Sequence, residues 1–259
     1  MTKDLTIVKI GGNVINDPDQ LISFLRDFSN LEGMKILVHG GGKKATEIAD
    51  AMGLSPKMAG GRRITDAANL EVVTMVYAGL LNKNIVASLQ ALNCNALGLS
   101  GADANVIRAH KRIVKEIDYG FAGDIDQVDS GMITCFLESG VSPVFSAITH
   151  DKNGQLLNTN ADTIAAELAK SMSAEYRVDL IYCFEKAGVL QDVENEDSII
   201  EEIDKLTYAD LVENGIIADG MLPKLKNCYE ALEHGVDKVR IGKPQLIGNK
   251  EIRYTTLKL

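Results

Sequence analysis

The sequence predicts an α/β fold, a three-layer αβα sandwich in which helices cover both faces of a mostly parallel central sheet. Short β-branched runs alternate along the chain with helix-length amphipathic stretches, which is the pattern of such folds. Several predicted strands are apolar at nearly every position, as strands buried on both faces are. The 259 residues suffice for a full core, and we expect two lobes, 1–174 and 175–259, in one unit.

Predicted strands and helices follow one another in order along the chain. The strands are rich in β-branched and aliphatic residues and cover 5–10, 34–39, 95–100, 141–148, 178–184 and 237–241. The helices show helical periodicity of apolar residues and cover 18–30, 43–53, 66–93, 129–139, 160–173 and 220–235. Two segments break the rhythm: 106–129 predicts one or two hairpins over one end of the sheet, and the acidic 191–204 predicts a solvated loop with a short helix or strand.

The longest predicted helix, 66–93, carries apolar residues along one side and is expected to be outermost, which makes it the candidate contact of a homodimer. Thr65 or Asp66 can cap its N-terminus. Arg62 and Arg63 precede it, although cations oppose the helix dipole there. Because the planar guanidinium group suits a carboxylate, we expect this pair to serve a ligand.

The composition excludes several classes of protein. A net charge of −9 argues against a nucleic-acid partner, because such surfaces need basic patches. No apolar run approaches the roughly 20 residues that cross a bilayer, and no signal peptide is visible, so we expect a cytoplasmic protein without membrane contact. The four cysteines, Cys94, Cys135, Cys183 and Cys228, lie far apart among apolar neighbours, which favours reduced, buried thiols over zinc ligands. No protein-bound metal is expected.

Two predicted strands run into glycines. Gly11 and Gly12 end "KIGG", and Gly41 and Gly42 end "HGGG". Glycines at the carboxyl end of a parallel strand leave backbone N–H groups and a helix N-terminus open to an anion such as phosphate. One such pair is better explained by a tight turn, whereas two pairs at neighbouring strand ends favour a site. Neither turn has the spacing of a Walker A loop or of a dinucleotide-binding fingerprint.

Three charged residues belong to the candidate site. Lys9 lies at the end of a predicted buried strand, where a lysine is costly unless its ammonium group binds an anion. The alternative is that the Lys9 side chain lies on the solvent-facing side of the strand. Lys224 lies in the first turns of a helix with Asp219 as the predicted N-cap; taken alone it is typical of a surface lysine. Asp162 can hold two lysines by charge-assisted hydrogen bonds.

Asn158 and Asn160 cluster with Asp162 in "LNTNAD", at the start of a predicted helix. A helix cap explains one of these three polar residues, so three exceed what capping needs. We expect an amide such as that of Asn158 to hydrogen-bond a substrate carboxylate or amide.

The ordered set "KIGGN", "VHGGG", "GRRITD", "LNKNIVA", "GLSGAD", "LNTNAD" and "DGMLPKL" resembles the amino acid kinase family, and within it the kinases that phosphorylate N-acylated glutamate for arginine biosynthesis. The resemblance covers about residues 5–235. It implies the amino acid kinase fold, with ATP and an N-acyl-glutamate as substrates, Mg²⁺ carried with the ATP, and a homodimer. It also implies that the first lobe binds the acyl amino acid and dimerises, while the second binds the nucleotide.

The resemblance assigns roles residue by residue. Lys9 and Lys224 correspond to two lysines that stabilise the transferring phosphoryl group, and Asp162 to the acid that organises them. The backbone cradle for phosphate and substrate corresponds to Gly11, Gly12, Gly41 and Gly42, and the grip on the acylated amino acid to Arg63, Asn158 and Asn160. Nucleotide contacts are implied at Glu185, Lys186, Ala187, Gly188, Val189, Leu190, Ile216, Ile217 and Ala218. A carboxylate acceptor is already ionised at neutral pH, so no histidine is needed as a base.

The chain departs from the family pattern at three places, and one of them is the tail, 238–259, which lacks the family's usual ending. Glu185 and Lys186 stand where relatives carry a serine or threonine followed by an aspartate. Gly60 and Arg62 replace an asparagine and an aliphatic residue, which makes room for a larger, negatively charged acyl group. The alternatives therefore include N-succinylglutamate as the preferred substrate, another kinase of the family, and a catalytically silent amino-acid sensor.

Overall fold

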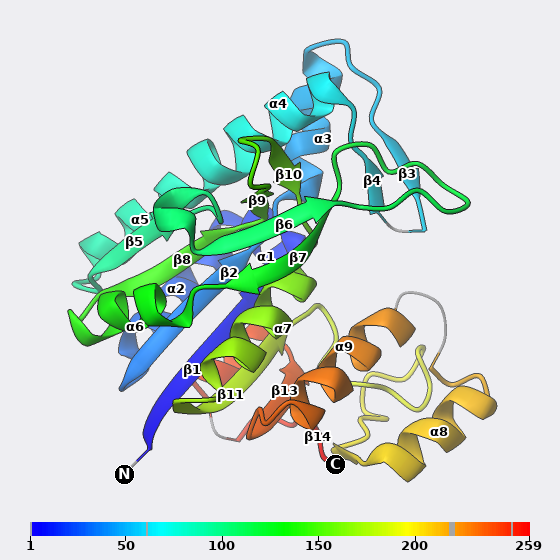
Figure 1. The fold of residues 1–259 in the computed structure, drawn as a ribbon. Coiled ribbons are helices and arrows are strands. Elements are labelled where there is room, and N and C mark those ends of the chain that lie inside the picture. Colours follow the sequence, from blue (N-terminus) through cyan, green and yellow to red (C-terminus); the bar gives the residue numbers. More distant parts are fainter. Residues whose placement is uncertain (1, 61, 218–220, 250) are drawn as a thin grey trace.

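The central feature of the computed structural model, which describes residues 2–60, 62–217, 221–249 and 251–259, is an eight-stranded sheet (Figure 1). In spatial order its strands are β12 (Glu202–Ile203), β14 (Thr255–Leu257), β13 (Lys238–Gly242), β11 (Tyr176–Cys183), β1 (Lys3–Ile10), β2 (Met34–His39), β8 (Ser142–Ser146) and β5 (Ala96–Leu99). Neighbouring strands are parallel except β13 and β14, which are antiparallel. The predicted mostly parallel sheet is confirmed.

Helices cover both faces of this sheet, as predicted (Figure 1). One layer contains α6 (Ser130–Glu138), α7 (Ala161–Met172) and α9 (Leu222–Glu233). The other contains α2 (Pro18–Asn30), α3 (Gly42–Ala51) and the long helix formed by α4 (Ala67–Thr74), a π-helical stretch (Met75–Leu81) and α5 (Asn82–Ala91). The remaining helices are α1 (Gly12–Asn16), α8 (Lys205–Glu213) and two short 3₁₀ turns, Asp103–Asn105 and Pro244–Ile247.

Two small sheets complete the fold. One has the order β10 (Leu156–Asn158), β9 (Ile148–His150), β6 (Ile107–Lys111) and β7 (Gly123–Val128), and the other pairs β3 (Lys57–Ala59) with β4 (Arg62–Ile64). The antiparallel pairing of β6 and β7 confirms the hairpin predicted within 106–129. The single strand predicted at 141–148 is wrong, because the chain leaves the central sheet after Ser146 and resumes as β9 in the other sheet.

The predicted elements fall close to the observed ones, with some local errors. The acidic segment 191–204 is a loop that ends in β12, as expected, but α8 directly after it was not predicted. Helix α9 begins at Leu222 with Met221 in the N-cap position, whereas the predicted cap, Asp219, lies outside the described residues. Asp66 does cap the long helix, because its carboxylate accepts the backbone N–H of Asn69 at 2.8 Å.

The long helix, Ala67–Ala91, corrects the expectation that no segment is long and apolar enough to cross a bilayer, because by length and mean hydropathy alone it qualifies. In the structure α5 packs on β5 and β8, and α4 packs on α3. Its side chains Asn69 and Asn82 are buried. These contacts are those of an outer-layer helix that packs one side onto the sandwich.

The cysteines are free thiols, and Cys94, Cys183 and Cys228 are buried as expected. Cys135 is exposed, which corrects the prediction of four buried thiols. It lies on α6, between the buried positions Ile133 and Leu137 of that amphipathic helix, and therefore on the solvent side. Burial raises the pKa of Cys183 to about 12, so this thiol is inert as a nucleophile.

His39 makes folding stability depend on pH. It is fully buried, and burial lowers its pKa to about 4. Its Nδ1–H donates to the carbonyl oxygen of Gly40 at 2.8 Å, and its Nε2 accepts from the Asn82 amide at 3.1 Å, so the neutral ring is fully paired. Below about pH 6.5 the His39 imidazole is protonated in the unfolded chain but stays neutral in the folded protein. The free energy of unfolding should fall by about 2 kcal/mol between pH 8 and pH 5 through this residue.

Urea unfolding of the wild type and of His39→Asn at several pH values measures this loss. The variant should lose that part of the pH dependence, while His234→Asn, at an exposed position, should keep it. Equal slopes for the wild type and His39→Asn would contradict the assignment.

Gly41 is required by packing, whereas Gly12 is not. A Cβ on Gly41 would lie 2.4 Å from Cδ1 of Leu81 and 2.9 Å from Cδ1 of Tyr77, and nothing lies within 4 Å of one on Gly12. Gly41→Ala should therefore lower the free energy of unfolding by about 1–3 kcal/mol. Gly12→Ala, the matched control, should change it by no more than about 0.5 kcal/mol. Urea unfolding of both variants tests this contrast, and equal losses would contradict it.

Candidate active site

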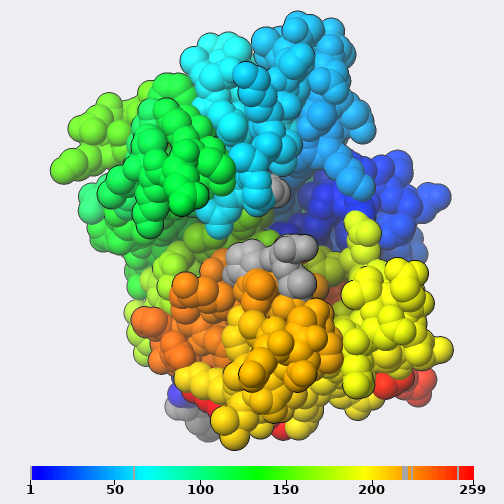
Figure 2. All heavy atoms as spheres, turned by 90° about the vertical axis from the view of Figure 1, so that its right-hand side faces the viewer, coloured from blue at the N-terminus to red at the C-terminus, as the bar shows by residue number. Residues whose placement is uncertain are grey.

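A cleft of about 420 Å³ opens at the carboxyl ends of β1 and β2, opposite the start of α7 and beside β4. Ligands of open α/β sheets bind at this edge, and the volume suits a small molecule. Figure 2 shows the surface hollowed where the N-terminal half, blue to cyan, faces the C-terminal half, yellow to orange. Of the predicted site residues it is lined by Lys9, Gly12, Gly41, Gly42, Arg63, Asn158, Asn160 and Asp162.

Lys9 and Asp162 form a buried ion pair at the floor of the cleft. The Lys9 Nζ lies 2.6 Å from the Asp162 Oδ1, and the two side chains are only 10% and 12% exposed. Lys9 belongs to β1, where it is in register with Tyr182 of β11, and Asp162 lies in the first turn of α7. The Tyr182 hydroxyl donates to the Asp162 carbonyl oxygen at 3.0 Å. Strand and helix therefore fix both members of the pair.

The second lysine, Lys224, lies near Lys9, because the ammonium groups of both contact the ring of Phe184. The Lys224 Nζ lies 4.3 Å and the Lys9 Nζ 5.4 Å from the centroid of the Phe184 ring. The two ammonium nitrogens are thus no more than about 10 Å apart, a separation that the triphosphate of one nucleotide can bridge. Lys224 lies in the first turn of α9, as predicted, and does not itself line the cleft.

Arg63 is held in the opposite wall with unused hydrogen-bonding capacity. The side chain is 7% exposed. One terminal nitrogen, Nη2, donates to the Gly42 carbonyl at 3.1 Å and to the Thr46 hydroxyl at 2.7 Å. The other, Nη1, is buried without a partner among the described residues. An unpaired buried donor is costly, so the geometry favours a ligand acceptor beside it.

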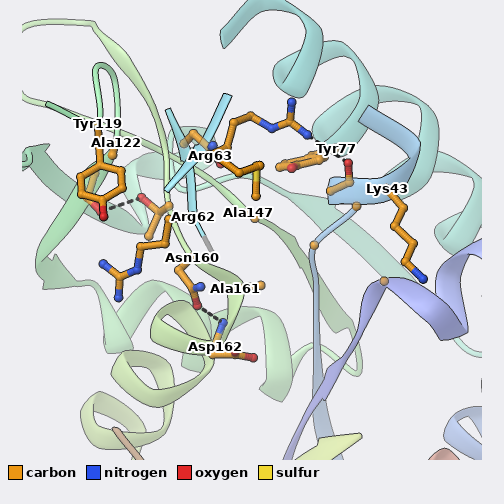
Figure 3. A pocket seen from close by; sticks show the side chains of 18 of the residues that line it. Lys43, Arg62, Arg63, Tyr77, Tyr119, Ala122, Ala147, Asn160, Ala161 and Asp162 are labelled. Carbon is orange, nitrogen blue, oxygen red and sulfur yellow. Dashed lines mark hydrogen bonds between the residues drawn. The ribbon is translucent and has the colours of Figure 1, made fainter. Parts of the chain in front are cut away.

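Asn158 and Asn160 each use part of their hydrogen-bonding capacity within the protein. The Asn160 Oδ1 caps α7 by accepting from the backbone N–H groups of Asp162 at 2.8 Å and Thr163 at 3.1 Å. Only its Nδ2 can therefore donate to a ligand. The Asn158 Nδ2 donates to the Thr65 hydroxyl at 2.9 Å, which orients its amide in the wall of the cleft. Asn160 points into the cleft beside Asp162 (Figure 3).

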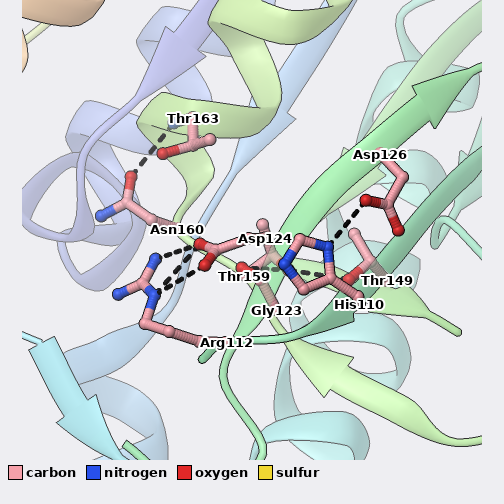
Figure 4. A network of polar contacts seen from close by, with 9 residues as sticks. All are labelled: His110, Arg112, Gly123, Asp124, Asp126, Thr149, Thr159, Asn160 and Thr163. Carbon is pink, nitrogen blue, oxygen red and sulfur yellow. Dashed lines mark hydrogen bonds and ion pairs between the residues drawn. The ribbon is translucent and has the colours of Figure 1, made fainter. Parts of the chain in front are cut away.

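The cleft has strong positive charge. Its described lining contains Lys9, Lys43, Arg62, Arg63 and Arg112 against the carboxylate of Asp162. Burial first, and then the nearby Arg112, lowers the pKa of Arg62. Arg112 is held by a bidentate contact to Asp124, behind which His110 contacts Asp126 at 2.7 Å (Figure 4). A protein with a net charge of −9 thus concentrates cations where an anionic ligand fits.

The segment predicted to contact nucleotide lies beside β13 and β14 and does not line this cleft. Glu185 is exposed, and Lys186 pairs with Glu196 at 3.4 Å. Val189 and Leu190 are buried, and the Val189 N–H already donates to the Thr255 hydroxyl at 2.8 Å. The remaining predicted positions divide into Ala187 and Ile216, which are half-buried, Gly188 and Ile217, which are buried, and Ala218, which lies outside the described residues.

Sequence reasoning missed several residues of the site. Phe184 closes the predicted strand 178–184, where an aromatic residue after an apolar run resembles ordinary core. Lys43 follows the second glycine turn directly, and Tyr77 lies within the predicted helix 66–93, where an aromatic residue suits the apolar side. Arg112 gave no usable signal, because only the hairpin geometry of β6 and β7 brings it to Arg62.

Residues 4–243 match the model of the amino acid kinase family. The chain is 52% identical to an acetylglutamate kinase of Bacteroides thetaiotaomicron, over 97% of this chain and 98% of that one, and 36% identical to one of Brachyspira hyodysenteriae, over 93% and 83%.

Solved structures with lower identity share the fold. An N-acetylglutamate synthase of Neisseria gonorrhoeae has a TM-score of 0.84 at 21% identity and covers 100% of this chain and 60% of its own. A carbamate kinase of Giardia lamblia bound to AMP-PNP has a TM-score of 0.70 at 15% identity and covers 98% of both chains. This chain belongs to the amino acid kinase family, because the family model matches residues 4–243 and a relative is 52% identical over nearly the whole chain.

Proposed function

We propose that the protein transfers the γ-phosphoryl group of ATP to the side-chain carboxylate of N-acetylglutamate, a step of arginine biosynthesis. The observation that carries this proposal is the Lys9–Asp162 ion pair, with Lys224 beside it, across a cationic cleft from Arg63. Two cations close to one point suit a phosphoryl group in transfer, and a buried guanidinium with a free donor suits a carboxylate. The named relatives at 52% identity act on acetylglutamate.

In this mechanism the protein positions two anions and reduces their repulsion. Lys9 and Lys224 stabilise the charge on the equatorial oxygens of the phosphoryl group, and Asp162 keeps the Lys9 ammonium oriented. Mg²⁺ arrives with the ATP as part of that substrate. The acceptor carboxylate is ionised at neutral pH, so the reaction needs no general base. His39 is buried and both of its ring nitrogens are paired within the protein, so it takes no part in proton transfer.

The other contacts divide between the two substrates. Gly12, whose backbone is open to a ligand, faces the phosphates together with Gly11. Arg63 and Asn158 bind the acylated amino acid, with the Asn160 Nδ2 as a further donor. Residues 175–259 bind the nucleotide base and ribose, and residues 1–174 bind the acyl amino acid. The protein acts in the cytoplasm, without nucleic-acid or membrane partners.

The alternatives differ in the acceptor. The names of the relatives favour the acetyl over the succinyl group. Carbamate, aspartate and glutamate lack an acyl group, and the cleft has donors beyond those that a bare amino acid carboxylate uses, namely Arg62, Lys43 and the Asn160 amide. A silent sensor would not need the costly buried Lys9–Asp162 pair.

We infer that the protein forms a homodimer through the long helix and the neighbouring edge strand β5. Met75, Leu80 and Leu97 expose 52%, 43% and 38% of their surfaces on this side of the molecule. Large apolar side chains gathered at a sheet edge are typical of an interface between two copies related by a two-fold axis.

Trapping of the acyl phosphate product with hydroxylamine tests the proposed reaction. With MgATP, N-acetylglutamate should give hydroxamate, and N-succinylglutamate, glutamate, aspartate and carbamate should give less.

Lys224→Ala should lower kcat by roughly 10²–10³-fold with a modest change in KM. Arg63→Ala should mainly raise the KM for the acylated amino acid.

A matched control is Lys226→Ala, two residues further along α9, whose side chain is 74% exposed. This variant should keep wild-type turnover. Unchanged turnover in Lys224→Ala, or no hydroxamate from any acylated glutamate, would contradict the proposal.

The dimer is tested by size-exclusion chromatography with light scattering. The wild type should elute with the mass of two chains, and Leu80→Glu should elute as a monomer, because the new carboxylate would lose its hydration in the interface. Leu206→Glu, at an 80% exposed position on α8, is the control and should remain dimeric. A monomeric wild type would rule out this interface.

A further inference from the structure

We infer that Phe184 is a positioning residue that holds the ammonium groups of Lys9 and Lys224 toward one phosphoryl group; this inference rests on the proposed function. Both nitrogens lie within cation–π distance of its ring, at 5.4 Å and 4.3 Å from the centroid. Two cations that share one ring repel each other, and the negative face of the ring offsets part of that repulsion before the nucleotide arrives.

Phe184 is held by a backbone hydrogen bond and by an aromatic neighbour of its ring. Phe184 follows β11 directly, and its backbone N–H donates to the Gly242 carbonyl at 2.8 Å. Its ring stacks on Tyr182 with centroids 6.0 Å apart and planes inclined by 10°. Residues two apart in an extended chain face the same side, which is the side of α7 and Asp162.

These contacts form a closed circuit. Lys9 contacts the Asp162 carboxylate, the Asp162 carbonyl accepts from Tyr182, Tyr182 stacks on Phe184, and Phe184 contacts Lys9 again. Lys224 contacts this circuit at the ring. Asp162 positions Lys9 by charge, and Lys224 has no ion-pair partner among the described acidic groups. Among the described residues, the aromatic face is therefore the contact that orients Lys224.

Replacement of Phe184 by phenylalanines with one, two and three ring fluorines tests the role of the ring face, because fluorine withdraws π density while it keeps the ring shape. Turnover should fall stepwise with fluorine number, and Phe184→Leu should lower kcat about three- to thirty-fold, the range that a cation–π contact supplies. The KM for N-acetylglutamate should stay within about twofold. Phe184→Tyr, which keeps the ring face, should retain most of the turnover.

Phe28 provides the matched control. Its ring lies 5.4 Å from the Lys35 ammonium, at the opposite end of the sheet from the cleft. The same fluorinated residues at position 28 should leave kcat unchanged. Wild-type turnover with trifluorinated Phe184, or a loss of equal size at position 28, would overturn the inference.

Nuclear magnetic resonance of lysine side chains separates this inference from the proposed reaction, because it needs no substrate. The ring current of Phe184 should shift the Hε signals of Lys9 and Lys224 upfield, and Phe184→Leu should return both to ordinary values. The variants Lys9→Arg and Lys224→Arg assign the signals. Unshifted lysine signals in the wild type would overturn the inference, whereas shifted signals in a protein without kinase turnover would count against the proposed function alone.

Discussion

The site depends on one buried contact, the ion pair between Lys9 and Asp162. Two charges that are almost fully removed from water lose hydration, and their attraction compensates for this only with good geometry. The 2.6 Å contact comes from two rigid elements, the central strand β1 and the first turn of α7. The pair places a lysine that is already oriented at the carboxyl edge of the sheet. The rest of the cleft is arranged around that fixed cation.

Much of the fold was predictable from the sequence, because the pattern of burial is local. β1 and β2 are apolar on both faces and were found within a residue or two, and the caps Asp66 and Asn160 follow from short side chains before helical runs. The unpredicted strand β14 has only three residues, too few for a pattern, and tertiary pairing with β12 and β13 defines it.

The site was predictable in its residue types but not in its contacts. Lys9 stood out because a charge at a buried strand position is costly, Arg63 because a cation opposes the helix dipole, and Asp162 because its polar cluster exceeds what a helix cap needs. The structure places all three in one cleft. Phe184 did not stand out, because an aromatic residue at the end of an apolar strand resembles ordinary core. The segment 185–190 was assigned by resemblance, and in the structure its buried part packs against β14.

The order of strands in the central sheet has a consequence for how the two halves of the chain relate to each other. β1, from the first half, pairs along eight residues with β11, from the second, and also with β2. A single hydrogen-bonded ladder therefore joins the regions on either side of residue 175. Rigid-body separation of these regions would break that ladder, so adjustment to ligands falls to sheet twist and to the hairpins at its rim. Residues 175–259 would also be a poor unit to express alone or fuse to another protein, since the edge of β11 that pairs with β1 would be exposed.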